Sequence, residues 1–589
     1  MADWCLVNKK HNCTKLPPTV ARLVANRGIT TDEEAKAYIS GGLELMHDPQ
    51  LFKDVKKGTD IILNGIKEGK RIRIIGDYDA DGVCSSAILC RGLKAIGAKV
   101  DVAIPHRVRD GYGLNARLIT EAVEDGVDII LTCDNGIGAY DQIALAKEKG
   151  LTVVVTDHHE VPYDEVDGVK QYKLPPADAL IDPKQADCPY PYKDICGALV
   201  AYKFIQYLYD SIPHLNPQYA KVCKDTHFDD ELLQLAALAT VTDIMPLRDE
   251  NRVVVKRGLE LMTSEPAMGI AQLKEVQGIS SMQISVYHLG YIIGPCINAA
   301  GRLDSADRAF ALLTSSTDAE ALKIAEDLKD LNETRKQMEE KALKTGMTLL
   351  DDNKVQVVYL PECHESIAGI VAGKLKEACN KPVLVATRTT GTMLKGSGRS
   401  IDEYPLYHEM TKVKDLFVGF GGHALAAGFS LDMSNLNALR ERLNANCTLT
   451  DDDIRGKILI DMKLNLADAT EDLADSLETL APFGTGNRKP RFLTTDLCLR
   501  KMSPMGQNGK MAHLFVEEDN NEFDIVTFRH AEELVLGVAD KYGLSVSESL
   551  IRGDKITEPI KLSVVYTVAW NEFRGNKRVQ IQVEDFRLN

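Results

Sequence analysis

The chain has 589 residues, of which 44% are hydrophobic and 26% charged, a composition typical of soluble globular proteins. Its net charge of −16 argues against a surface coated with positive charge for duplex binding, although a local groove could still hold phosphates. No apolar run is long enough to span a bilayer and no signal-peptide core is present, so we expect a cytoplasmic protein without a membrane partner. Thirteen cysteines without a CxxC pair predict reduced thiols.

Residues 1–70 are expected to form an N-terminal helical segment. Thr31 is followed three residues later by Glu34, which is the spacing of a capping box at the start of a helix. Gly41 and Gly42 are expected to end that helix. We expect no chemistry from this segment.

Three carboxylates follow a short apolar run in the sequence RIRIIGDYDADGV, residues 71–83. Asp77, Asp79 and Asp81 stand at alternate positions, where an extended chain would point them the same way. Like charges this close raise each other's pKa unless a cation neutralises them, so the stretch predicts a divalent metal site. A calcium-binding EF-hand loop is excluded, because its twelfth position would be Ile88 in place of Glu. From this stretch alone, a solvated acidic turn stays an alternative.

From residue 71 the pattern alternates between strands and helices, which predicts a parallel sheet covered on both faces. We assign residues 71–315 to this domain. The strands are expected at 71–76, 99–104, 128–133, 152–156 and 178–181, and the helices at 83–96, 115–125 and 139–149. Ligands of such sheets lie beyond the carboxyl ends of the strands. Other polar clusters should therefore follow these strands.

Three polar clusters do follow them: Asp134-Asn135-Gly136, Asp157-His158-His159 and Asp182-Pro183. Each cluster alone has a simpler explanation, since Asp-Asn-Gly is a common turn and a His after a strand is more often solvated than a ligand. All three at one edge of one sheet favour a metal centre.

Asp243 directly follows the apolar helical run 231–242, where a negative charge is unfavourable against the helix dipole. A nearby cation would explain it, with a capped turn as the alternative.

The stretch 294–304 is rich in small residues, which allow close backbone approach, and contains Asn298 and Arg302. Arg302 could bind a phosphate or form a surface ion pair.

A long amphipathic helix over residues 316–350 is predicted to connect the first domain to a second one. We expect its apolar face to carry Leu322, Ala325, Leu328 and Leu331.

The second domain, residues 351–450, is also predicted to be α/β. Its motif GSGRS, which contains Ser397 and Arg399, offers backbone N–H groups, hydroxyls and a guanidinium that could cradle a phosphate. A glycine-dense loop with Gly421, Gly422 and His423 either packs against a nucleotide or forms a tight structural turn.

Residues 451–589 show alternating strand patterns separated by glycine turns, which predict a small antiparallel barrel. Basic and aromatic residues interleave in it, as in grooves that bind single strands by base stacking. An ordinary barrel core with solvated strands is the alternative for any one of these residues: Phe483, Arg488, Lys489, Arg491, Trp570, Phe573, Arg574, Lys577 and Arg578.

The motifs, in this order, resemble those of the DHH phosphoesterase superfamily, and within it the bacterial RecJ family of single-strand-specific 5′ exonucleases. They are DYDADG, CDNG, Asp157-His158-His159, the Asp243 helix end, GPCINAAGRL, GSGRS, FGGHALAAG and the C-terminal APFGTGNRKPRF and NEFRG. The resemblance covers nearly the whole chain. It implies an α/β protein with a DHH domain, a connecting helix, a DHHA1-like domain and a C-terminal barrel that resembles the oligonucleotide-binding (OB) fold.

The resemblance also implies roles for single residues. His159 would contact the scissile phosphate, with Asp77 and Arg302 as further catalytic residues, and Arg107 would contact the terminal phosphate. Substrate would also be bound by Asn298, Arg302, Ser397, Arg399, Gly421, Gly422 and His423. The metal ligands would be Asp79, Asp81, Asp134, His158 and Asp243, with Asp77 as an additional or supporting acid and Asp134 between two ions.

The oxygen-rich ligand set favours two Mn²⁺ or Mg²⁺ ions over zinc. The family resemblance implies hydrolysis of single-stranded DNA to 5′-mononucleotides in the 5′ to 3′ direction by two-metal catalysis, in DNA repair and recombination. We expect a single-strand-binding protein and a helicase as partners. The chain departs from the family in carrying Cys296 where Arg is common and Cys363 where an aromatic residue is common.

Two other functions stay open. The chain could be a DHH-family phosphodiesterase of short oligonucleotides or cyclic dinucleotides, although the C-terminal barrel argues against this. It could also be a non-catalytic scaffold that binds single-stranded DNA, although that function would not require the retained ligands.

Overall fold

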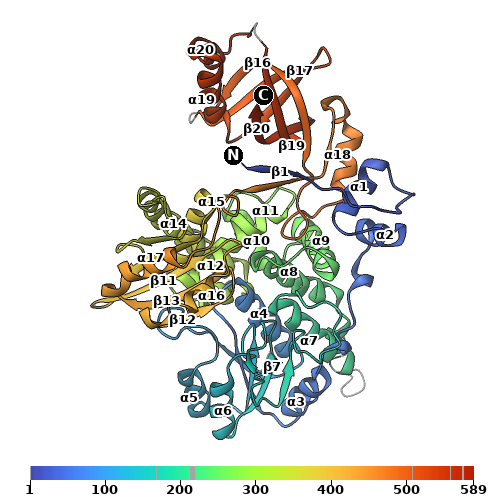
Figure 1. Cartoon of the computed structure of the whole chain (residues 1–589). Helices are drawn as coiled ribbons and strands as arrows, with labels where there is room; N and C mark the ends of the chain where they lie inside the picture. The colour runs from blue at the N-terminus through green and yellow to red at the C-terminus, as the bar shows by residue number, and fades with distance from the viewer. Residues whose placement is uncertain are drawn as a thin grey trace. The chain divides into compact units, whose positions relative to one another are not determined.

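A computed structural model describes residues 2–166, 169–212, 219, 221–506, 509–556, 559–573 and 576–589, so Arg574 lies outside the described residues. The chain forms two compact units (Figure 1). One combines Met1–Glu44 with Gly456–Asn589, and the other is Leu45–Arg455. None of the described helices combines the length and the apolar character that a membrane span needs.

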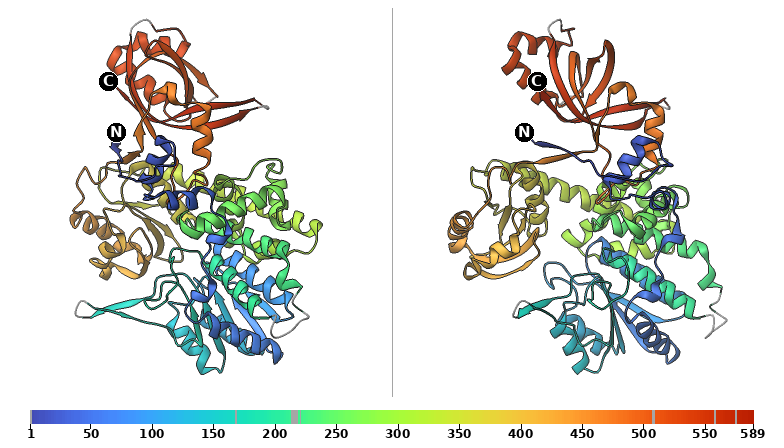
Figure 2. Two further views of the ribbon diagram at one scale, coloured as in Figure 1. Left: turned by 90° about the vertical axis from the view of Figure 1, so that its right-hand side faces the viewer. Right: turned by 45° about the vertical axis from the view of Figure 1, so that its right-hand side comes forward.

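The larger unit is built on a parallel sheet with the strand order β3-β2-β4-β5-β8. Its strands are β2 (Arg71–Ile75), β3 (Lys99–Ala103), β4 (Ile129–Cys133), β5 (Thr152–Thr156) and β8 (Ala179–Ile181). The hairpin β6 (Tyr163–Val166) and β7 (Val169–Tyr172) follows β5 and extends away from the sheet (Figure 2).

Helices cover both faces of this sheet, as the continuous apolar strands predict. On β4, Ile129 and Leu131 pack in the larger core with one set of helices, whereas Ile130 packs in a separate core on the other face. The first face carries α3 (Val55–Lys67), α4 (Ala80–Ala95) and α7 (Gly197–Ser211); the second carries α5 (Ala116–Glu124) and α6 (Tyr140–Glu148).

A helical layer extends the first core and leads to the second sheet. It consists of α8 (Thr226–Thr242), α9 (Asp249–Ser264), α10 (Met268–Val276), α11 (Val286–His288), the π-helix η6 (Leu289–Ile293), α12 (Gly294–Leu303), α13 (Asp307–Thr314) and the connecting helix α14 (Asp318–Met347). Along α14, Ala321, Ala325 and Leu328 are buried, as the helical period requires. Leu322 was expected on this face but is exposed, because it lies one position away from the buried stripe.

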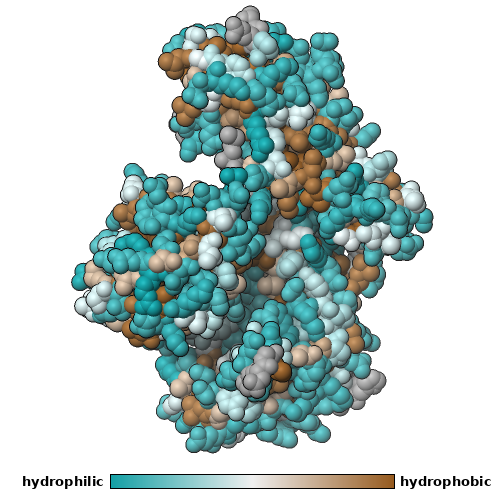
Figure 3. Space-filling view, in the orientation of Figure 1, coloured by the Kyte–Doolittle hydropathy of each residue, from teal (hydrophilic) through white to brown (hydrophobic). Residues whose placement is uncertain are grey.

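The second sheet has the order β12-β13-β11-β10-β9, and only its β9–β10 pair is parallel. Its strands are β9 (Gln356–Tyr359), β10 (Val383–Arg388), β11 (Met393–Arg399), β12 (Phe417–Gly422) and β13 (Ala426–Asp432); its helices are α15 (Ala368–Cys379), α16 (Leu406–Thr411) and α17 (Leu436–Ala445). Figure 3 shows a hollow between this part and the part built on the first sheet.

The smaller unit is a closed five-stranded barrel with helices added. The closing pair is β16 (Phe492–Met505) with β19 (Ile560–Phe573), and the remaining strands are β17 (Met511–Glu518), β18 (Asn521–Thr527) and β20 (Asn576–Leu588). The unit also contains α18 (Glu471–Glu478), α19 (Ala531–Tyr542), α20 (Leu544–Arg552) and the short strand β15 (Met462–Lys463). The barrel was predicted to be antiparallel, but β18 and β20 pair in parallel, because two helices separate β18 from β19.

N-terminal residues belong to this smaller unit. Strand β1 (Asp3–Leu6) pairs in parallel with β14 (Lys457–Ile460), and helices α1 (Pro18–Asn26) and α2 (Asp32–Ser40) join the barrel core. The capping box at the start of α2 is confirmed: the Thr31 hydroxyl accepts a hydrogen bond from the Glu34 N–H at 3.3 Å, and the Glu34 carboxylate accepts one from the Thr31 N–H at 3.1 Å.

Two local predictions were wrong. Helix α4 begins at Ala80 and not at residue 83, because the Asp79 carboxylate caps it by accepting hydrogen bonds from Asp81 N and Gly82 N. The motif GSGRS is not a loop but part of β11, a strand paired on both sides. Its backbone N–H groups are therefore engaged in a sheet and cannot form the expected phosphate cradle. Gly396 is required there because a Cβ would collide with the Phe429 ring.

Candidate active site

The acidic loop after β2 is held in place by the ends of two helices. Asp79 caps α4, which places Asp81 in its first turn. The Asp81 carboxylate accepts hydrogen bonds from Gly197 N and Ala198 N, both at 2.7 Å, at the start of α7. Gly82 is required by this packing, since a Cβ would lie 2.5 Å from the Asp77 carbonyl oxygen. Asp79 and Asp81 are thus positioned at helix N-termini and not by an extended chain, whereas the Asp77 carboxylate accepts a hydrogen bond from Gly113 N at 3.3 Å.

Asp134 and Asp243 come from the ends of other elements. Asp134 directly follows β4 in the left-handed backbone region, with φ 58°, and Gly197 packs against its Cα and Cβ. The Tyr112 hydroxyl donates a hydrogen bond to the Asp134 carbonyl at 2.6 Å. Asp243 is the C-cap of α8, as its place after the apolar run indicated.

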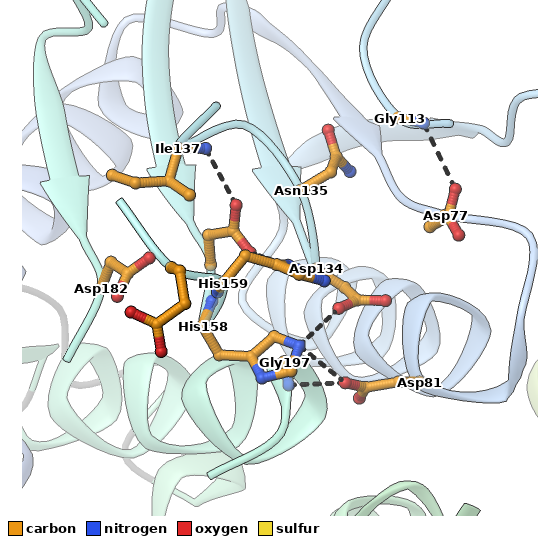
Figure 4. Close-up of polar contacts among 12 residues, drawn as sticks. Asp77, Asp81, Gly113, Asp134, Asn135, Ile137, His158, His159, Asp182 and Gly197 are labelled. Atoms are coloured by element: carbon orange, nitrogen blue, oxygen red, sulfur yellow. Dashed lines mark hydrogen bonds and ion pairs between the residues drawn. The ribbon is translucent and has the colours of Figure 1, made fainter. Parts of the chain in front are cut away.

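The two histidines of the Asp157-His158-His159 sequence make different contacts. His158 Nε2 lies 3.0 Å from Asp134 Oδ1, 3.6 Å from Asp81 Oδ2 and 3.8 Å from Asp243 Oδ2. Asp157 turns away from this point: its carboxylate accepts hydrogen bonds from Ile137 N and His158 N and contacts His159 Nδ1 at 2.7 Å. The aspartate therefore fixes the loop that positions both imidazoles, and Figure 4 shows His158 directed at Asp134 and Asp81.

Potential ligand atoms gather in three overlapping groups within the described residues. In each group, the ligand atoms lie within 4.8 Å of one another. The groups are Asp77, Asp79 and Asp134; Asp81, His158 and Asp243; and Asp134, Asp157, His158 and His159. All six residues predicted from the sequence as metal ligands are thus brought together. Asp134 connects the first group to His158.

Burial makes this many negative charges unfavourable without a cation. Removal from water and the neighbouring carboxylates raise the pKa values of Asp77, Asp134 and Asp243 well above the usual range, and that of Asp81 to about 6. Asp243 Oδ2 is buried and accepts no hydrogen bond. Oxygen ligands of this kind, with one imidazole, suit hard or borderline divalent cations. The residues present therefore fit a divalent metal centre.

The two histidines are driven to opposite charge states. Burial lowers the pKa of His158 to about 3, which keeps its imidazole neutral as a ligand must be. Burial also disfavours the charged form of His159, but the charge and hydrogen bond of Asp157 outweigh it and raise the pKa of His159 to about 9. The reciprocal interaction with His159 outweighs burial at Asp157 and lowers its pKa to about 2. The second imidazole is therefore a cation at neutral pH.

A second cluster consists of cationic side chains around a pocket of about 190 Å³. Arg302 donates a hydrogen bond to the Ser366 carbonyl at 2.7 Å, and Arg399 donates one to the Ser397 hydroxyl at 2.8 Å. Arg107 stacks its guanidinium 3.9 Å from the centre of the Tyr78 ring. The pocket is lined by Arg107, Val108, Arg302, Glu365, Ser366, Gly369, Ser397 and Arg399.

This pocket is short of negative charge. Its one lining acid, Glu365, is paired with Lys395 at 2.8 Å. Burial, followed by repulsion from Arg107, lowers the pKa of Arg302 to about 9. A bound anion would relieve both effects. The pocket is suited to a phosphate.

Other predicted site residues lie elsewhere. Asn298 Oδ1 accepts a hydrogen bond from Ala80 N at 2.9 Å and so braces the acidic loop. Gly421 and Gly422 end strand β12, and His423 follows in the exposed turn to β13. His423 is not among the ligand groups in the described part of the chain. Cys296 is buried and accepts a hydrogen bond from Gln277 at 3.1 Å.

Sequence reasoning missed four contributors to the site. Asp157 was recorded only as part of a motif, although it directly follows a buried strand and could have been proposed on that ground. The other three contribute single polar groups. Tyr112 contributes a side-chain hydroxyl from a distant loop, Gly197 its backbone N–H and Ser366 its backbone carbonyl. A sequence pattern gives little signal for contacts of this kind.

Comparisons with known proteins match three family models in order along the chain. They are the DHH family N-terminal domain at residues 71–240, the DHHA1 domain at 352–448 and the RecJ OB domain at 460–585.

Curated relatives match over nearly the full chain. The single-stranded-DNA-specific exonuclease RecJ of Bacillus subtilis is 31% identical, over 97% of this chain and 68% of that protein. The same-named protein of Escherichia coli is 30% identical, over 97% of this chain and 96% of that protein. The structure of RecJ in complex with Mn²⁺ from Thermus thermophilus has a TM-score of 0.79 and 26% identity, covering 100% of this chain and 80% of that one. The chain belongs to the RecJ family of DHH proteins.

Proposed function

We propose that this protein is a metal-dependent exonuclease that degrades single-stranded DNA from the 5′ end and releases 5′-mononucleotides. The proposal rests on one observation. Two clusters of potential metal ligands, connected by the contact of Asp134 with His158, lie in the same compact unit as an arginine-lined anion pocket. Family membership supports it, because the curated relatives are named single-stranded-DNA-specific exonucleases.

The metal centre is proposed to hold two Mn²⁺ or Mg²⁺ ions, since RecJ of Thermus thermophilus has been solved in complex with each. Asp77, Asp79 and Asp134 would hold one ion, and Asp81, His158 and Asp243, together with Asp134, would hold the other. When bound, the ions supply activation of water and neutralisation of charge on the phosphate during in-line hydrolysis.

The chain's own side chains then orient the substrate. His159, kept cationic by Asp157, is proposed to contact the scissile phosphate. The Tyr112 hydroxyl lies 3.2 Å from the His159 ring and limits its rotation. Arg107, Arg302 and Arg399 are proposed to hold the terminal 5′-phosphate, which sets the end from which the strand is cut.

The wider setting is also part of the proposal. We assign residues 1–70 to the N-terminal segment, 71–315 to the DHH domain, 316–350 to the connecting helix, 351–450 to the DHHA1-like domain and 451–589 to the OB domain. The barrel would bind the strand beyond the site. We place the activity in the cytoplasm, with a single-strand-binding protein and a helicase supplying the substrate because the acidic chain alone attracts DNA weakly.

A strand-end assay tests the proposal. Purified protein with Mn²⁺ receives single-stranded DNA labelled at the 5′ or the 3′ end. We expect early release of labelled mononucleotide from the 5′ label only, loss of release in Asp134→Ala, and normal release in Asp141→Ala, which removes an exposed acid from α6. A ladder that shortens from the 3′ end, or cleavage of di- to pentanucleotides only, would contradict it.

A further inference from the structure

An exposed pair of tyrosines stands outside the site described above. Tyr287 is 60% exposed and Tyr291 71% exposed, in α11 and the π-helix η6. Their ring centroids lie 5.2 Å apart with planes 22° from parallel, so the rings stack on each other. Exposed aromatic rings can serve as surfaces on which nucleic-acid bases stack. A π-helical turn is itself uncommon and occurs often at functional sites.

The pair lies on a helical face that leads into the site. From residue 286 to 303, the helices α11, η6 and α12 are continuous, and one side, with Leu289, Ile293, Ile297 and Ala300, is buried in the core. The exposed Tyr287 and Tyr291 share one side of the helix with the half-buried positions 295, 298 and 302, because these positions are three or four residues apart. Asn298 on this face contacts the acidic loop at Ala80, and Arg302 lines the anion pocket.

Helix α8, which leads to Asp243, packs against the same helical segment. A Cβ on Gly294 would collide with the Thr242 side chain, and one on Gly290 would lie 3.7 Å from Val241 Cγ1. Both contacts are to the last turn of α8, which ends at Asp243. The tyrosine-bearing turn is therefore held between two elements that supply site residues.

We propose that Tyr287 and Tyr291 form a stacking platform for bases of the single strand on the 3′ side of the scissile phosphate. The inference rests on the proposed exonuclease function. With a rise of about 1.5 Å per residue, Tyr291 lies about 10 Å and Tyr287 about 16 Å along the helix from Asn298. For a strand that keeps the base stacking of a duplex, with a rise of roughly 3.4 Å per nucleotide, these lengths correspond to about three to five nucleotides from Asn298. A dinucleotide would not reach them.

The experiment measures binding of a 5′-phosphorylated fluorescent oligonucleotide series, from two to twelve nucleotides, in the Asp134→Ala background so that no cleavage occurs. We expect the added Y287A/Y291A change to weaken binding of strands of six or more nucleotides roughly tenfold or more and to leave dinucleotide binding unchanged. Y287F/Y291F, which keeps the rings, should bind like the parent. An abasic site at positions three to five should remove the difference.

A second exposed tyrosine pair, Tyr163 and Tyr172 on the hairpin β6–β7, supplies a matched control. Y163A/Y172A should not change the length dependence, and an equal loss there would overturn the assignment. Unchanged affinity in Y287A/Y291A, or a change only in particle mass by light scattering, would also overturn it and favour a protein interface. The proposed function itself is tested separately, by the strand-end assay on the protein that keeps the native Asp134, whereas the platform is tested by binding alone.

Discussion

Substitution of Gly197 by Ala should damage the metal centre although it replaces none of the proposed ligands. Gly197 is the first residue of α7, so a methyl group adds no backbone strain, and its N–H can still bind Asp81. The new Cβ, however, would lie 2.7 Å from Asp134 Cβ and 3.0 Å from Asp134 Cα, where ordinary contacts begin at 3.4 Å. Relief requires Asp134 to move by about 0.7 Å or more, away from its position beside His158.

A displacement of this size has a large catalytic cost, since about 1 Å of misplacement can lower a rate about 100-fold. We expect kcat/KM on single-stranded DNA to fall roughly 30- to 100-fold, up to about 2.7 kcal/mol, and the Mn²⁺ concentration for half-maximal activity to rise.

Gly138→Ala is the matched control, because its Cβ would meet only Pro162 at an ordinary 3.6 Å. Thermal unfolding of both variants checks that the fold is retained. Native kcat/KM and metal dependence in a folded Gly197→Ala protein would refute the reasoning.

Three further substitutions each test a single contact or pocket residue. In Asp157→Asn, loss of the charge that raises the pKa of His159 to about 9 should make His159 neutral at lower pH, so the alkaline limb of the pH–activity profile should move to lower pH; an unmoved limb would contradict this. Glu250→Ala should lower the free energy of urea unfolding by about 3–5 kcal/mol, because it leaves the fully buried Lys203 ammonium, 2.9 Å away, without its counter-charge; the K203M/E250L pair should recover most of the loss. Arg399→Ala should reduce the kcat/KM ratio of 5′-phosphorylated over 5′-hydroxyl strands roughly tenfold or more, and an unchanged ratio would remove Arg399 from the phosphate pocket.

The first sheet and its ligand edge were predictable because parallel buried strands are continuous apolar runs, and their carboxyl ends meet at one edge. The anion pocket was less accessible to prediction. Arg302 and Ser366 are 64 positions apart, and their contact depends on how the second sheet packs. The GSGRS motif misled because glycine permits both a loop and a close approach, and only the fold places Phe429 against Gly396.

Capping explains a subtler difference. The alternation of Asp77, Asp79 and Asp81 suggested an extended stretch, but an aspartate before a helix can accept backbone N–H groups and start the helix early. The sequence predicted the right cluster of acids although it predicted the wrong backbone conformation. An extended stretch and an early helix start both bring these acids to the end of strand β2.

The pairing of β1 with β14 makes the smaller unit discontinuous in sequence. During synthesis its first 44 residues emerge long before their partners, and this unit can be completed only after the whole of Leu45–Arg455 has been made. The finished protein also has two covalent crossings between its units in place of one. A fragment that begins after residue 44 would therefore lose a strand of the smaller unit and one of the two chain connections between the units.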